Sequence, residues 1–65
     1  MNNSYMYLSA FKPGDIVYLI TDVYQLPRMI IEVIFGNGHI KYFCSSGAED
    51  STHYEMEITK EKQVI

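Results

Sequence analysis

The sequence has little cysteine and little basic charge, and it has no tryptophan. Cys44 is the only cysteine, so a disulfide within the chain is excluded, and a lone thiol is typical of a reducing compartment. Five Lys and Arg residues stand against eight acidic residues, which gives a net charge of −3. Because nucleic-acid binders usually carry a basic stripe, this balance disfavours a nucleic-acid partner.

Long apolar runs are also missing. No run approaches the length of a membrane-spanning helix. The first ten residues contain neither a basic residue nor a long apolar block, so we expect no signal peptide. Together with the lone thiol, these absences predict a cytoplasmic protein.

Patterns that hold metals or cofactors are equally scarce. His39, Cys44 and His53 lack the close spacing of zinc ligands. Gly36 and Gly38 belong to a hairpin turn and open no helix, so they do not form a phosphate-binding loop. We therefore expect no metal and no cofactor.

The sequence is rich in Tyr, Ile, Val and Phe, which favour β-strands. Tight turns are expected at Pro13-Gly14-Asp15 and at Gly36-Asn37-Gly38, the second of which is a strong hairpin signal. The segments that we expect to form strands are Ile16–Ile20, Arg28–Phe35, His39–Ser45 and Ser51–Ile58, with a short fifth strand at Val64-Ile65. This pattern predicts one all-β domain over residues 11–65, a small, partly open barrel of four to five antiparallel strands, preceded by an N-terminal arm over residues 1–10.

Two short patterns precede the hairpin. The first is Gly-Asp-x-Val-x-Leu over residues 14–19, and the second is Pro-x-Met-x-Ile over residues 27–31. In this order, and followed by a Gly-containing hairpin, they resemble the YodC-like family of small uncharacterised bacterial proteins over roughly residues 11–44. The chain departs from that family in two ways. Its connection from Ile20 to Leu26 is longer, and its third strand has no Trp, with Cys44 near the position that the Trp would occupy. The resemblance implies an SH3-like barrel, and it implies no activity.

Alternation along the strands divides the apolar residues into two faces. The residues that we expect in the interior are Val17, Leu19, Met29, Ile31, Val33, Ile40, Tyr42, Tyr54, Met56 and Ile58. A second apolar set then points outward, namely Ile16, Tyr18, Ile20, Ile30, Ile34 and Phe43. Burying a large apolar side chain is worth about 1.5–3 kcal/mol, so leaving five or six of them in water forgoes roughly 10 kcal/mol.

This outward set predicts a surface that something covers. The candidates are a second copy of the chain, another protein, or the N-terminal arm with Tyr5, Met6, Tyr7 and Leu8. The sequence therefore predicts a small non-enzymatic interaction module that self-associates, most simply as a homodimer, or binds another protein. The predicted interaction residues are Ile16, Tyr18, Ile20, Ile34 and Phe43 on the outer face, with Tyr24 and Leu26 on the loop that follows the first strand.

Two alternatives stay open at this point. One is a nucleic-acid-binding small barrel, because aromatic residues are plentiful. The other is recognition of an extended peptide in a groove lined by Tyr18, Tyr24 and Tyr42. We expect no catalytic residue, because Cys44 fits a buried thiol, Glu55 and Glu57 fit a solvated face, and the two histidines fit the surface.

Overall fold

The computed structural model describes residues 9–62 and contains five strands in one open sheet. The elements are β1 (Ile16–Leu19), β2 (Arg28–Gly36), β3 (His39–Ser45), β4 (Asp50–Tyr54), the 3-10 turn η1 (Glu55–Glu57) and β5 (Ile58–Thr59). The strand order is β4-β3-β2-β1-β5, and every neighbouring pair is antiparallel. The predicted all-β fold is confirmed, and the open, curled sheet is consistent with a small, partly open barrel.

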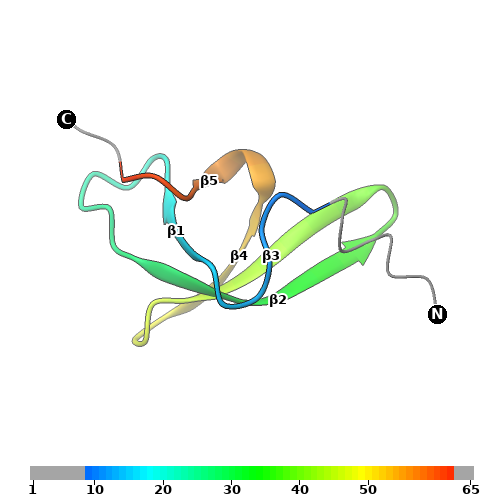
Figure 1. Ribbon diagram of the computed structural model, residues 1–65, viewed down its shortest axis with the longest axis horizontal. Helices are drawn as coiled ribbons and strands as arrows, with labels where there is room; N and C mark the ends of the chain where they lie inside the picture. The colour runs from blue at the N-terminus through cyan, green and yellow to red at the C-terminus, as the bar shows by residue number, and fades with distance from the viewer. Residues whose placement is uncertain (1–8, 63–65) are drawn as a thin grey trace.

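The long and short strands lie in different parts of the sheet. β2 and β3 form a long hairpin that extends to one side of the molecule, while β1, η1 and β5 gather at the other end (Figure 1). The hairpin turns at Asn37 and Gly38, which both have positive φ angles (40° and 78°), as a tight two-residue turn requires. Within residues 9–62, no helix has the length and apolarity that crossing a bilayer requires.

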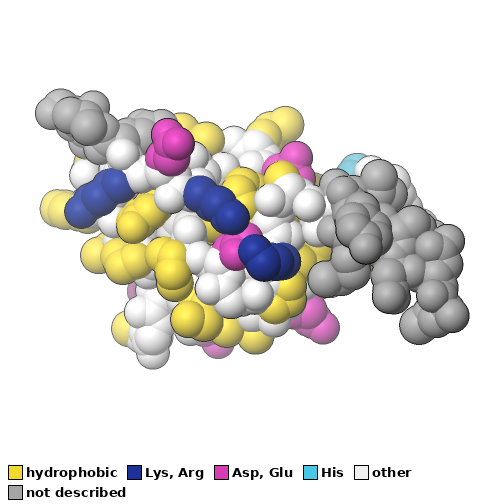
Figure 2. Space-filling model, viewed as in Figure 1, with side chains coloured by type: hydrophobic (Ala, Val, Ile, Leu, Met, Phe, Trp, Pro, Cys, Tyr) yellow, Lys and Arg dark blue, Asp and Glu magenta, His cyan; other side chains and the backbone are white. Residues whose placement is uncertain are grey.

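Asp15 fixes the turn that precedes β1. Its carboxylate accepts a hydrogen bond from the Lys12 N–H at 3.0 Å and lies 3.0 Å from Lys12 Nζ and 3.3 Å from Lys60 Nζ. The Lys12 N–H foremost, and then the two ammonium groups, lower the pKa of Asp15 to about 2. Basic and acidic side chains lie next to one another among apolar ones on the face seen in Figure 2. Since Lys60 follows β5, this cluster connects the end of β5 to the turn before β1.

The core is small and lies on the concave face of the sheet. Its buried residues are Val17, Ile30, Tyr42, Cys44 and Ile58, and Phe11, Leu19, Val33 and Ile40 pack against them. The Phe11 ring meets the Tyr42 ring edge-on, with centroids 5.4 Å apart. The Tyr42 hydroxyl donates to Glu55 Oε1 at 2.9 Å, and burial foremost raises the pKa of Tyr42. The predicted interior is therefore confirmed for Val17, Tyr42 and Ile58, and partly for Leu19, Val33 and Ile40.

A β-bulge in β2 overturns part of the predicted interior. Ile30 pairs with Cys44 and Glu32 pairs with Phe43, so Ile31 is the extra residue between them. The bulge changes the phase of the alternation, so that Ile30 and Val33 share the inner face although they are three residues apart. Ile30 is therefore buried, whereas Met29 and Ile31 are exposed, which is the reverse of the prediction.

The predicted fourth strand also ends early. β4 stops at Tyr54, and residues 55–57 turn into η1 before β5 begins at Ile58. Tyr54 pairs with Lys41 on the outer face, and Met56 projects from the turn, so both residues are exposed and their predicted place in the interior is wrong. The predicted strand at Val64-Ile65 lies outside the described residues, as does most of the predicted arm.

Candidate functional site

A series of apolar side chains lies along the outer face of β2 and its neighbouring strands, with Glu32 among them. We call it the outer patch and define it as Ile16, Met29, Ile31, Ile34 and Phe43. Cross-strand pairing joins Ile16 to Met29 directly, and Phe43 lies diagonally across from Ile34. Ile16, Met29 and Ile31 are 42%, 44% and 48% exposed, and Ile34 and Phe43 are also in contact with solvent. A shallow hollow of about 200 Å³, lined by Ile34 and Lys41 among others, continues the patch toward the hairpin turn.

The outer patch contains some of the predicted interaction residues and not others. Ile16, Ile34 and Phe43 lie in it. Tyr18 lies on the same face of β1 but pairs with Thr59 of β5 and is half-buried. Ile20 is exposed just beyond β1, where its N–H donates to the Glu57 carbonyl. The sequence placed Met29 and Ile31 in the interior, so it missed both of them as surface residues.

The predicted loop residues lie outside the sheet. The Asp22 carboxylate organises the loop by accepting hydrogen bonds from the N–H groups of Tyr24 at 3.0 Å and Leu26 at 3.1 Å. These bonds, with that of Leu26 the larger influence, lower the pKa of Asp22. The side chains of Tyr24 and Leu26 are left exposed, at 81% and 50%. The loop is thus a compact turn with two apolar tips.

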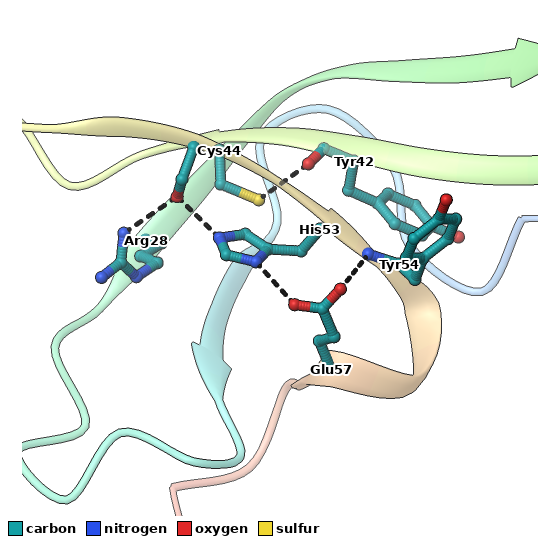
Figure 3. A network of polar contacts seen from close by, with 7 residues as sticks. Arg28, Tyr42, Cys44, His53, Tyr54 and Glu57 are labelled. Carbon is teal, nitrogen blue, oxygen red and sulfur yellow. Dashed lines mark hydrogen bonds and ion pairs between the residues drawn. The ribbon is translucent and has the colours of Figure 1, made fainter.

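A second arrangement lies on the inner face of β4, where four side chains form a chain of hydrogen bonds (Figure 3). Arg28 Nη1 donates to Ser51 Oγ at 3.1 Å, and Ser51 Oγ lies 2.6 Å from His53 Nε2. His53 Nδ1 lies 3.0 Å from Glu57 Oε2. The other Glu57 oxygen accepts the Tyr54 N–H at 3.0 Å, which fixes the carboxylate.

The chemistry of the two end groups sets the direction of these bonds. Arg28 only donates and an ionised Glu57 only accepts, so His53 Nδ1 carries the proton that Glu57 receives. When the imidazole carries a proton on Nδ1 alone, its Nε2 lone pair accepts the single hydroxyl proton of Ser51.

Burial and charge make this network unusual for so small a protein. Arg28 is 9% exposed, and no carboxylate within residues 9–62 lies at ion-pair distance from it. Its Nε is buried and has no hydrogen-bond partner in the described part of the chain. The Tyr54 N–H first, and then His53, lower the pKa of Glu57, which favours its charged form. Burial raises the pKa of the nearby Cys44 thiol, although Arg28 acts in the opposite direction.

One part of this network is predictable from the sequence, and the rest is not. Ser51 and His53 are two residues apart on one strand, so they share a face. A continuous strand would have placed Glu57 about 13 Å from His53, whereas η1 folds it back into contact. The prediction that His53 is a surface residue is wrong, because its side chain is only 12% exposed.

The described residues contain no group of three or more His, Cys, Asp or Glu side chains arranged to hold a metal ion. Comparison with protein-family models, with curated proteins and with solved structures finds no match for this chain. The resemblance to the YodC-like family stays a prediction.

Proposed function

We propose that this protein is an interaction module that self-associates through the outer patch, forming a homodimer. The observation that carries the proposal is the number of solvent-accessible apolar side chains on the outer face of the sheet, which are the residues of the outer patch. Exposed apolar residues gathered on one face mark interaction sites in soluble proteins.

A second copy is the occupant that size and charge favour. A chain of 65 residues buries a small core, and chains of this length often gain stability by association. The outer face also carries both signs of charge beside the patch, because Glu32 lies opposite Phe43 and Lys41 lies opposite Ile34. With a suitably placed two-fold axis, Glu32 of one copy would face Lys41 of the other, so the charges of this surface could complement one another.

The nucleic-acid alternative has less support from the placement of the cations. Lys12 and Lys60 pair with Asp15, and Arg28 is buried. Lys41 lies 5.2 Å from the centroid of the Tyr54 ring, which makes a single cation–aromatic pair and no basic stripe.

Sedimentation velocity over a wide range of protein concentrations tests the proposal. We expect the wild-type chain to be dimeric and the variant Ile31→Glu to be monomeric, because a charge in the patch is costly to bury. Met56→Glu is the matched control, since Met56 is 84% exposed and lies on η1, outside the patch. A wild-type protein that is monomeric at every concentration, or equal disruption by both variants, would overturn the proposal.

A further inference from the structure

We propose that Ser51 is a nucleophile toward activated esters, with His53 as its general base and Glu57 as the residue that positions His53. This inference does not depend on the outer patch, because Ser51 lies on the opposite face of the sheet. It also departs from the expectation, based on sequence, that the protein has no catalytic residue.

The geometry satisfies the two contacts that an activated serine needs. The nucleophile meets its base at 2.6 Å, between Ser51 Oγ and His53 Nε2, and the base meets its carboxylate at 3.0 Å, between His53 Nδ1 and Glu57 Oε2. In the neutral imidazole, a proton on Nδ1 toward Glu57 leaves Nε2 free to accept the hydroxyl proton. Glu57 is held in turn by the Tyr54 N–H, so the imidazole has a fixed orientation.

Arg28 supplies the electrostatic component. Its Nη1 is 3.1 Å from Ser51 Oγ, so a carbonyl group attacked by Ser51 would develop its negative charge near the guanidinium. Arg28 is buried and has no carboxylate at ion-pair distance within residues 9–62, although Asp22 interacts with it over a longer distance. A positive charge in such surroundings stabilises a developing negative charge more than a solvated one does.

Ser51 is also placed where a small substrate can approach. β4 is an edge strand of the sheet, and Ser51 is partly exposed, whereas its neighbour Cys44 on β3 is fully buried. The serine and not the cysteine is therefore the accessible nucleophile on this face.

The reaction follows from these positions. Ser51 Oγ forms a bond to the ester carbonyl carbon as its proton moves to His53 Nε2, and the carbonyl electron pair moves onto the oxygen beside Arg28. The ester C–O bond then breaks, the leaving alkoxide takes the proton from His53, and an acyl group remains on Ser51. Water then attacks the acyl carbon as His53 takes one of its protons. The bond between the acyl carbon and Ser51 Oγ breaks, Oγ takes the proton back from His53, and the carboxylic acid leaves.

Acetylation by 4-nitrophenyl acetate tests the proposal in the full-length chain. We follow nitrophenolate release and locate the acetyl group by peptide mass spectrometry. We expect acetyl on Ser51 and a rate that falls about 100-fold in His53→Gln, which is a usual loss for a general base. His39→Gln is the matched control and should react as the wild type does, because His39 lies at the start of β3 outside the network.

Two further readouts separate catalysis from folding. In Glu57→Gln the imidazole loses the carboxylate that positions it, so kcat for ester cleavage should fall while KM stays unchanged. In Ser51→Cys the thiol introduced at position 51 should react with iodoacetamide faster than Cys44, and this reaction should slow when His53→Gln is added. The proposal would be overturned if acetyl groups were found only on lysines. It would also be overturned if His53→Gln left the rate of reaction with iodoacetamide at position 51 unchanged.

Discussion

At the scale of single residues, Asp15 shows how one carboxylate connects distant parts of the chain. It receives the Lys12 N–H and ion pairs from Lys12 and from Lys60, which lies beyond the last strand. The folded-state pKa of about 2 is below the ordinary value of 3.8, so ionised Asp15 favours the folded state. That contribution is complete above the unfolded-state pKa and is lost as the pH falls toward the folded-state pKa.

The variant Asp15→Asn tests this contribution. We expect it to lower the free energy of unfolding at pH 7 by about 1 kcal/mol, because the bonds are charge-assisted but close to solvent. We also expect its stability to vary less than that of the wild type between about pH 4 and pH 2. Thermal unfolding across this pH range measures both effects, with Glu61→Gln, an exposed carboxylate, as the control for loss of charge. An unchanged pH dependence in Asp15→Asn would contradict the assignment.

At the scale of elements, the bulge in β2 determines that Ile30 is buried in the core and that Ile31 is exposed. Ile30→Ala should lower the free energy of unfolding by about 2–4 kcal/mol, because it removes buried methylene groups and leaves a cavity. Ile31→Ala, one residue away and exposed, should cost less than about 1 kcal/mol in dilute solution. Urea denaturation of the two variants measures this difference. Similar losses in both, or a larger loss in Ile31→Ala, would place the bulge elsewhere.

The tight turns and the bulge in β2 show how far the sequence predicts the fold. The turns at Gly14 and at Asn37-Gly38 and the strands beside them follow from local chemistry, so their positions were predictable. The bulge between Ile30 and Glu32 depends on long-range pairing with β3, which no local pattern encodes, and it inverted the predicted faces of Met29, Ile30 and Ile31.

The two candidate sites differ in how far the sequence predicts them, because one depends on local strand alternation and the other on long-range contacts. Outward apolar residues such as Ile16, Ile34 and Phe43 follow from strand alternation alone. The network around Ser51 requires Arg28 from two strands away and Glu57 from η1, where the alternation breaks. A sequence pattern that assumes a continuous strand therefore separates residues that the fold brings together.

At the scale of the whole molecule, the proposed dimer links stability to association. Five apolar residues are buried within residues 9–62, while several isoleucines remain exposed on the outer face. When only the dimer buries such surface, mass action links apparent stability to protein concentration. The folded state of this chain should therefore become more stable as its concentration rises.

Thermal unfolding at several concentrations measures this dependence. For a tenfold rise in concentration, a dimer that unfolds to separated chains gains up to about 1.4 kcal/mol, which corresponds to a rise in Tm of several degrees for a domain of this size. The variant Ile31→Glu should show a Tm independent of concentration, whereas Met56→Glu, which leaves the outer patch intact, should behave as the wild type does. A wild-type Tm that stays constant over a hundredfold range of concentration would mean that the monomer is the complete folding unit and that its exposed isoleucines contribute nothing to its stability.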